Sequence, residues 1–245
     1  MSSGILSNRI CLITGSSRGI GLGIARVFAE NGAIVVLHGR DEDSLHECLA
    51  ELSEPKQHSY ITADMNTPKG AAVLAAEFLR RHERLDVLIH SAGILGPLRI
   101  PLAEYPAESW NEVLQLNLTA PFIVTQALLS ALRKGDRPSV IFVSSGLGYQ
   151  GRAGWGAYSV SKFGVEGLSQ VWADELEAEG IKVNAVNPGG TRTQMRAAAY
   201  PQEDPMTLPT PEDIAAVFVW LARADTTVTG KSLEARDWVG RDPAV

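Results

Sequence analysis

Short apolar runs alternate with longer stretches of helical period along most of the chain. The strand candidates are almost continuously apolar, as is typical of strands that are covered on both faces. We predict strands at 9–14, 33–38, 59–63, 86–90, 139–144 and 181–187. We predict helices between them, at about 20–31, 42–53, 67–83, 107–132 and 156–179. This alternation predicts a parallel sheet joined by right-handed crossovers.

The alternation ends after Pro188 and Gly189. A polar, proline-rich segment follows, with at most one short helix near 193–199, and then a helix at 211–223 and a last strand at 231–235. A long segment between sheet elements is more often functional than a mere connector, so we expect a substrate lid over 190–209. The expected fold class is α/β. We predict one Rossmann-type domain over 1–245, with a doubly wound parallel sheet of about seven strands and helices on both faces.

Composition narrows the possible partners and compartments. The 245 residues carry a net charge of −6 and no run of Lys or Arg, which disfavours nucleic acid as a partner. No apolar run approaches the roughly 20 residues of a membrane span, so we expect a soluble protein without a membrane partner. Cys11 and Cys48 form no CxxC pair and no cluster with histidine, so we expect neither a disulfide nor a metal site. Reduced cysteines favour the cytoplasm.

A glycine-rich turn, TGSSRGIGLGIA, joins the first strand to the first helix. Gly15, Gly19 and Gly21 permit a tight turn and a close approach of the backbone to a pyrophosphate, which then lies at the positive end of a helix. A plain loop is the alternative, but the position after the first strand favours a dinucleotide, with Ser17, Arg18 and Ile20 as further contacts. The turn lacks the Gly-Lys-Ser/Thr ending of a P-loop.

The end of the second strand indicates which dinucleotide binds. Gly39 stands where an acidic residue would bond the ribose 2′-hydroxyl of NAD, and Arg40 follows it. Arg18 and Arg40 suit a 2′-phosphate, which guanidinium groups bind through paired hydrogen bonds. We therefore predict NADP(H) as the preferred cofactor. The alternative is NAD(H), with Arg40 solvated and the ribose bound by Asp41 or Asp43.

Six motifs occur in the order and spacing of a known family. They are TGSSRGIG (14–21), HSAG (90–93), Asn117, Ser145, YSVSK (158–162) and NPGGTRT (187–193). Over roughly residues 8–235 the chain resembles the short-chain dehydrogenases/reductases, which transfer a hydride between a nicotinamide and a carbonyl–alcohol pair. The stretch 189–205 also resembles a bacterial branch of this family to which we can attach no substrate.

Tyr158 and Lys162 lie one helical turn apart and therefore on the same helix face. Taken alone they could be a solvated pair, but carbonyl reduction needs a proton donor, and a tyrosine with a pKa of about 10 needs help to act near neutral pH. An ammonium group about 4 Å away at an effective dielectric near 20 contributes roughly 4 kcal/mol, or about three pKa units. We expect Lys162 to lower the pKa of Tyr158 in this way. The resemblance implies that Lys162 also binds the nicotinamide ribose.

The resemblance assigns the remaining roles. It implies that Ser145 hydrogen-bonds the substrate oxygen; Ser144 is the alternative, but its side chain should point to the opposite face of the strand. It implies that Asn117 relays protons through water to the lysine, whereas the residue alone would suggest a polar group that bends its helix. Further cofactor contacts follow by the same resemblance. The adenine would contact Asp64 and Met65, and the nicotinamide side would contact Ser91, Ala92 and Gly93. The carboxamide and pyrophosphate would contact Pro188, Gly189, Thr191 and Thr193.

Two departures from the family pattern stand out. His90-Ser91 replaces an Asn-Asn pair, so a shorter side chain stands where an asparagine stabilises the central sheet, and we expect His90 to be structural. The ending TGKSLEARDWVGRDPAV lacks the family's acid followed by two glycines, which places the tetramer geometry in doubt. The resemblance implies an interface made by the 156–179 helix and the 107–132 helix, and we expect a homodimer or homotetramer. The small stripe of Ala157, Ser161, Gly164 and Leu168 could serve that interface or only pack against the sheet.

We therefore predict an NADP(H)-dependent oxidoreductase with a small-molecule carbonyl or alcohol substrate. Leu95, Leu147 and Trp155 should shape the pocket. Arg152, Arg192 and Arg196 lie near it and could bind an anionic substrate, although we favour solvated side chains. A non-catalytic NADP(H)-sensing regulator is the alternative; such proteins usually lose the tyrosine or the lysine. A nucleotide-sugar epimerase or dehydratase would need a larger C-terminal domain than this chain offers.

Overall fold

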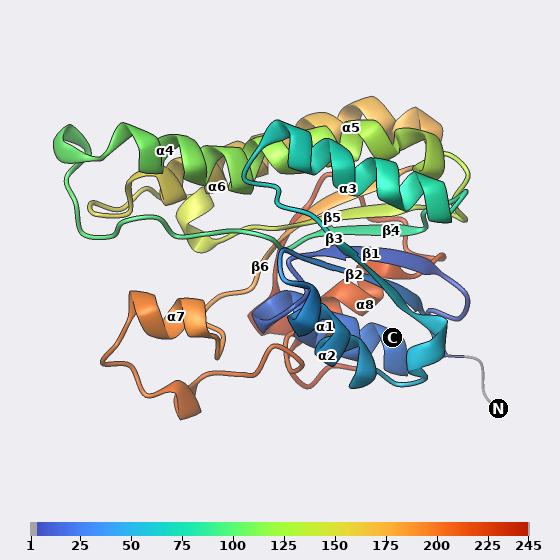
Figure 1. Cartoon of the computed structure of the whole chain (residues 1–245). Coiled ribbons are helices and arrows are strands. Elements are labelled where there is room, and N and C mark those ends of the chain that lie inside the picture. The colour runs from blue at the N-terminus through green and yellow to red at the C-terminus, as the bar shows by residue number, and fades with distance from the viewer. Residues whose placement is uncertain (1–3, 245) are drawn as a thin grey trace.

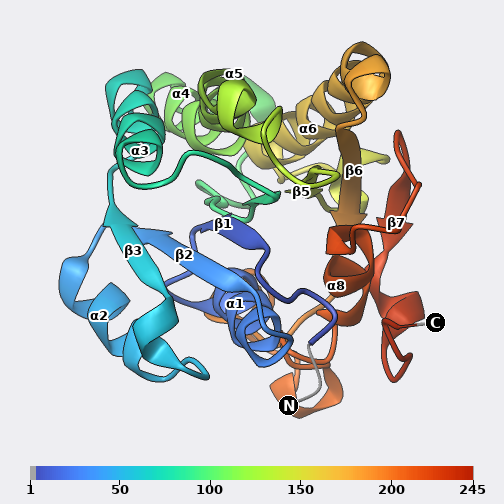
Figure 2. The ribbon, with the colours of Figure 1, turned by 90° about the vertical axis from the view of Figure 1, so that its right-hand side faces the viewer.

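Seven parallel strands form one sheet in the computed structural model, which describes residues 4–244. The strands are β1 (Ile10–Thr14), β2 (Ile34–Gly39), β3 (Ser59–Thr62), β4 (Val87–His90), β5 (Ser139–Val143), β6 (Lys182–Asn187) and β7 (Ser232–Glu234). Their order in the sheet is β3-β2-β1-β4-β5-β6-β7, so that β3 and β7 form the two edges (Figure 2). All seven predicted strands are confirmed. The predicted domain also includes residues 1–3 and 245, which lie outside the described part.

Helices cover both faces of the sheet, as the doubly wound prediction requires. On one face lie α1 (Gly19–Glu30), α2 (Glu42–Ala50) and α8 (Ala216–Ala222) (Figure 1). On the other face lie α3 (Pro68–Arg81), α4 (Ala107–Leu114), α5 (Ala120–Leu132) and α6 (Gly156–Leu176). The short helix α7 (Gln194–Ala199) stands beyond the sheet within the 190–209 segment. The fold class is therefore the Rossmann-type α/β sheet that the sequence predicts.

The central strands contribute to two hydrophobic cores, one on each face. In β1 the side chains of Cys11 and Ile13 belong to the core under α1 and α8, whereas Leu12 belongs to the core under α3, α5 and α6. Successive side chains of a strand point to opposite faces, so a strand buried on both faces must be apolar at every position. This geometry explains the almost continuous apolar runs in the sequence.

The predicted 107–132 helix is interrupted. A π-helical segment, Gln115–Thr119, separates α4 from α5. Among residues 4–244, this interrupted stretch is long and apolar enough to cross a membrane, whereas we predict no such stretch from the sequence. In this structure 44% of its most apolar window is buried. Core helices of globular proteins share this composition, because a helix packed on several sides is apolar on several sides.

The small stripe on α6 is buried at Ala157 and Ser161 and partly buried at Gly164 and Leu168. Ala157 and Ser161 have no exposed surface, and a Cβ on Gly164 would lie 2.6 Å from a methyl carbon of Leu118. Leu168 packs against the adjoining core. The stripe allows α6 to approach the π-helical segment, so part of its packing is against a helix rather than the sheet, and its part in an intersubunit surface stays a prediction.

The last predicted helix begins later than expected. Residues 211–215 form turns before α8, and Thr210 and Asp213 exchange hydrogen bonds there, with the Thr210 amide donating to the Asp213 carboxylate at 2.7 Å. Pro211 packs against α1, where a Cβ on Gly23 would lie 2.4 Å from the proline Cβ. Contact with α1 therefore fixes this stretch before the helix starts.

Candidate active site

The glycine turn lies where the carboxyl ends of the central strands meet, which is the binding edge of doubly wound sheets. Gly15 and Gly19 adopt positive φ angles of +66° and +59°. A Cβ on Gly15 would lie 2.6 Å from the Ala92 Cα, and one on Gly21 would lie 2.5 Å from the Gly15 carbonyl oxygen. In the described chain, Arg18 precedes α1 without a side-chain cap. The first amides of α1 are thus left for an anion such as a pyrophosphate.

His38 braces this turn, and sequence analysis did not single it out. The amide of Gly15 donates to His38 Nδ1 at 3.2 Å, so Nε2 carries the proton and donates to the Ala63 carbonyl at 3.2 Å. Burial lowers the pKa of His38 to about 4, which keeps the ring neutral. The histidine thereby ties the turn after β1 to the segment after β3. Its only signal in the sequence is a polar residue at the end of an apolar strand.

The end of β2 fits a phosphate better than a free ribose hydroxyl. Arg18 and Arg40 are exposed, and neither guanidinium has a hydrogen bond or ion pair within residues 4–244. Asp41, the alternative ribose ligand, caps α2 instead, because its carboxylate accepts from the Ser44 amide at 2.8 Å. Hydrogen bonds from Ser44 also lower the pKa of Asp41. Two cations without partners beside a capped acid suit the 2′-phosphate of NADP(H).

Tyr158 and Lys162 meet at the end of β5. Both are buried, with exposed fractions of 9% and 7%. Lys162 Nζ lies 5.7 Å from the centre of the Tyr158 ring and donates to the Val143 carbonyl at 2.7 Å. The Ser145 side chain, at the start of the loop after β5, lies close enough to the phenol to influence its pKa. The structure thus brings together the tyrosine, the lysine and the serine that were predicted from the sequence.

The expected fall in the pKa of Tyr158 is wrong for this structure. Burial raises its pKa above the usual 10, and the Ser145 side chain, rather than Lys162, lowers it. Burial also lowers the pKa of Lys162 to about 8, against the influence of Glu166 one turn further along α6. The physical reason is that the ammonium group points at the Val143 carbonyl, while the loss of water disfavours the phenolate. Tyr158 is therefore a protonated phenol at neutral pH.

Ser145 and Ser144 are in different surroundings. Ser145 accepts a hydrogen bond from the Leu147 amide at 3.2 Å and interacts with Tyr158. Ser144 is 1% exposed, and its hydroxyl oxygen is buried without a hydrogen-bond partner in the described chain. Both serines line the cleft, and the role of Ser145 stays a prediction.

Asn117 lies in the π-helical segment. Its Oδ1 accepts from the Ile94 amide at 2.9 Å, while Nδ2 donates to the Ile94 carbonyl at 2.9 Å and to Ser161 Oγ at 3.0 Å. These bonds tie the helix interruption to the loop after β4 and to α6. The alternative of a residue that bends its helix is therefore what the geometry shows, and the proton relay stays a prediction.

The loop after β4 is fixed by Thr14. The amides of Ser91 and Ala92 donate to Thr14 Oγ1 at 3.1 and 3.2 Å, which joins the ends of β1 and β4. His90 is buried, shares a 2.8 Å hydrogen bond with Thr125 and stacks on Phe142. Burial lowers the pKa of His90 to about 3. The prediction that His90 is structural is confirmed.

A cleft of about 640 Å³ opens beside Tyr158 and Ser145. Several predicted cofactor contacts border it, namely Ile20, Pro188, Gly189, Thr191 and Thr193. Leu95, Leu147 and Trp155 also line it, as predicted. Other predicted contacts lie around the turn and the strand ends: Ser17 packs near Gly39, Asp64 is exposed after β3, Met65 is buried, and Gly93 lies near Asn117.

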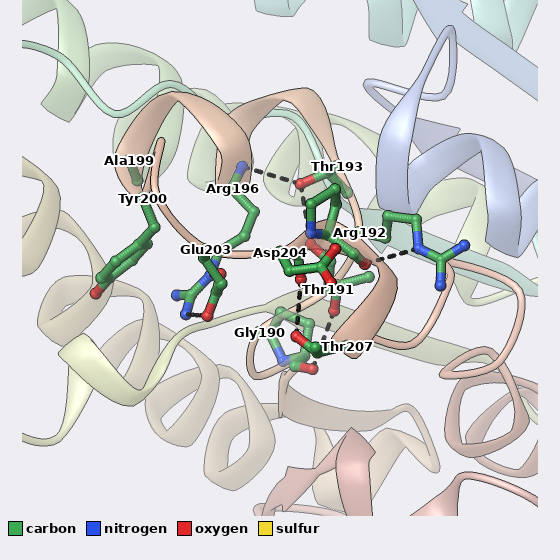
Figure 3. A network of polar contacts seen from close by, with 12 residues as sticks. Gly190, Thr191, Arg192, Thr193, Arg196, Ala199, Tyr200, Glu203, Asp204 and Thr207 are labelled. Atoms are coloured by element: carbon green, nitrogen blue, oxygen red, sulfur yellow. Dashed lines mark hydrogen bonds and ion pairs between the residues drawn. The ribbon is translucent and has the colours of Figure 1, made fainter.

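The 190–209 segment covers one side of this cleft and is held by its own polar contacts (Figure 3). Arg192 donates to the carbonyl oxygens of Pro205 and Leu208 at 2.9 and 3.0 Å. Arg196 forms a two-pronged ion pair with Glu203 at 2.6 and 2.8 Å. Thr193 caps α7 by accepting from the Arg196 amide at 3.1 Å. These contacts all lie within the segment itself.

Tyr200 is a further cleft residue that sequence analysis did not identify. Its ring centre lies 5.8 Å from that of Trp155, which in turn lies 5.9 Å from that of Tyr158. Arg196 Cζ lies 3.7 Å from the centre of the Tyr200 ring. The sequence offers only its place in the 190–209 segment as a signal, because the contact with Trp155 joins residues 45 positions apart.

Comparison with known proteins identifies the family. The family model for short-chain dehydrogenases matches residues 9–204, and this chain belongs to that family of oxidoreductases. The chain is 42% identical over 246 residues to the uncharacterized oxidoreductase YciK of Escherichia coli K12, covering 98% of this chain and 96% of YciK. Two solved structures are each 42% identical to this chain with a TM-score of 0.90. Each match covers 96% of this chain and 100% of the solved chain. They are a Shigella flexneri short-chain dehydrogenase complexed with NADP and an Escherichia coli CFT073 one complexed with NADPH.

Proposed function

We propose that this protein interconverts a carbonyl compound and an alcohol with NADP(H). The observation that carries the proposal is that Tyr158 and Ser145 line one cleft together with Ile20 of the glycine turn, while Lys162 lies beside Tyr158. A buried phenol beside a hydroxyl group provides a proton donor and a second donor for one substrate oxygen. Family membership supports the same reaction class.

Residues of this chain fit the proposed cofactor. The amides that begin α1 would hold the pyrophosphate, and Arg18 and Arg40 would hold the 2′-phosphate. Asp64, Met65, Ala92 and Gly93, with the Pro188–Thr193 stretch, would complete the site. When bound, NADPH supplies the hydride. The complexes of related proteins with NADP and NADPH support this choice over NAD(H).

Tyr158 acts in this proposal as the general acid of reduction. Since burial raises its pKa, the phenol is protonated at neutral pH and can donate its proton to the carbonyl oxygen as negative charge develops there. Ser145 donates a hydrogen bond to the same oxygen. Alcohol oxidation requires the phenolate, so that direction needs alkaline pH. The resting protonation state therefore favours reduction.

Lys162 has a separate part in the proposal. With a pKa of about 8 its ammonium group is mostly charged at neutral pH, and one of its three N–H groups is bonded to Val143. The remaining donors can bind ribose hydroxyls and keep the site positive beside Tyr158. Asn117 can support the loop after β4 through Ile94, with or without a water relay.

The direct test is a panel of aldehydes and ketones with NADPH, followed by the loss of absorbance at 340 nm, with NADH in parallel. We expect reduction of at least one class of carbonyl compound and faster rates with NADPH. Tight NADPH binding without turnover across the panel would instead support the alternative, an NADP(H)-sensing regulator.

We further propose that the protein is a homo-oligomer that assembles through the outer face of α5 and α6. This face exposes Phe122, Val160, Phe163 and Val171, with Val171 54% exposed. Contiguous exposed apolar groups of this kind mark interaction surfaces. We expect Phe163→Glu to yield monomers in analytical ultracentrifugation, whereas Val73→Glu on α3, which is similarly exposed, should leave the assembly intact. A parent protein that is monomeric at micromolar concentration would contradict this proposal.

The cysteines support a cytoplasmic location. Cys11 and Cys48 are both buried and free, which suits a reducing compartment. Fractionation of cells that express the protein with a fluorescent tag tests this assignment.

A further inference from the structure

The cleft is lined by basic but not by acidic side chains. Arg152 and Arg196 are the charged residues among its described lining, and no Asp or Glu borders it. The whole chain carries a net charge of −6, so the charge of the cleft lining is opposite in sign to that of the chain as a whole. A positive cleft in an acidic protein concentrates anions.

The arginines near the cleft differ in how far their charge is compensated. Arg192 is outside the lining and fastens the 190–209 segment. Arg196 is paired with Glu203. Arg152 contacts the Tyr200 hydroxyl at 3.5 Å and has no carboxylate partner within residues 4–244. Arg152 is therefore the cation that a ligand can neutralise.

Aromatic contacts through Trp155 and Tyr200 link Tyr158 to Arg152 and limit the length of such a ligand. Ring-to-ring steps of 5.9 and 5.8 Å lead from Tyr158 through Trp155 to Tyr200, whose hydroxyl contacts Arg152. A carbonyl group at Tyr158 and an anionic group at Arg152 would thus be separated by an apolar body that lies along two aromatic side chains.

We infer that the substrate is an elongated carbonyl compound with an apolar or aromatic body and a carboxylate at its far end, which Arg152 binds. This inference rests on the proposed reduction at Tyr158. Arg152 acts as a specificity-determining residue that binds the end of the substrate away from the reacting carbonyl. Arg196 contributes less because Glu203 already neutralises it.

The experiment uses 4′-formylbiphenyl-4-carboxylate and its methyl ester, whose two rings match the two aromatic steps. KM for both probes is measured with NADPH in the parent and in Arg152→Ala. We expect a lower KM for the carboxylate in the parent and a rise of about fivefold in Arg152→Ala, with no change for the ester. Arg241→Ala, an exposed arginine outside the cleft lining, should change neither KM.

A second variant tests the opposite direction. Glu203→Gln releases Arg196 from its ion pair and adds an uncompensated positive charge to the cleft. We expect this variant to lower KM for the carboxylate and to leave the ester unchanged. A loss of structure in the 190–209 segment would instead affect both probes.

Calorimetric binding of the same probes separates this inference from the proposed reaction. If the carboxylate binds in an Arg152-dependent way but neither probe is reduced, the anion site is supported and the proposed reaction is contradicted. Reduction of both probes with equal KM supports the reaction and overturns the anion site. Equal weakening of both probes by Arg152→Ala, or binding of neither, also overturns it.

Discussion

Acidification to pH 5 should destabilise this protein mainly through two buried histidines. Burial lowers the pKa of His38 to about 4 and of His90 to about 3, from an ordinary value of 6.5. Below pH 6.5 the unfolded chain binds protons at these sites that the folded chain does not, so stability falls as the pH falls. Between neutral pH and pH 5 each histidine then contributes a loss of about 2 kcal/mol. A total of about 4 kcal/mol is a large share of the roughly 5–15 kcal/mol that folded domains have.

Urea unfolding at pH 7 and pH 5 measures this loss. His82 shifts in the same direction but is only partly buried, and the perturbed carboxylates titrate below this window. The double variant His38→Asn/His90→Gln should be less stable at pH 7 yet lose much less stability on acidification. A double variant that loses as much between the two pH values as the parent would refute the reasoning.

Two further predictions concern the cofactor and the direction of the reaction. Arg40→Asp should shift preference from NADPH toward NADH by about tenfold or more in kcat/KM, since a charge-assisted hydrogen bond contributes about 1.5–3 kcal/mol. An unchanged ratio of the two kcat/KM values would leave Arg18 as the phosphate ligand or contradict the choice of cofactor. Alcohol oxidation with NADP should accelerate as the pH rises into the alkaline range, because burial raises the pKa of Tyr158, whereas carbonyl reduction should be flat through neutral pH. An oxidation rate that saturates below pH 7 would contradict this account of the phenol.

The pattern of apolar residues predicted the sheet because the burial of a strand shows directly in its own residues. Strands β1, β2, β4, β5 and β6 are largely buried on both faces and appear as mostly apolar runs, whereas the edge strands β3 and β7 are partly exposed. The glycine turn was also predictable, since a tight turn between β1 and α1 leaves no room for a Cβ on Gly15 or Gly21. These features depend on neighbours in the chain or on burial alone.

Other features depend on contacts that no local pattern records. The π-helical segment accompanies hydrogen bonds between Asn117 and Ile94, which are 23 residues apart. The i, i+4 spacing placed Tyr158 and Lys162 on one face but did not show that the ammonium group points at Val143. The role of His38 follows from a strand and two loops that meet only in the folded chain.

The central claim is that Tyr158 gives its proton to the substrate oxygen. Replacing it by phenylalanine removes the hydroxyl group and keeps the ring beside Trp155, and Tyr149→Phe serves as the matched control outside the cleft lining. The decisive measurement is the rate of NADPH oxidation by Tyr158→Phe with a carbonyl compound that the parent reduces, together with NADPH binding followed by fluorescence. We predict a fall of at least about 100-fold in rate with unchanged binding. Turnover at the parent rate would contradict the claim.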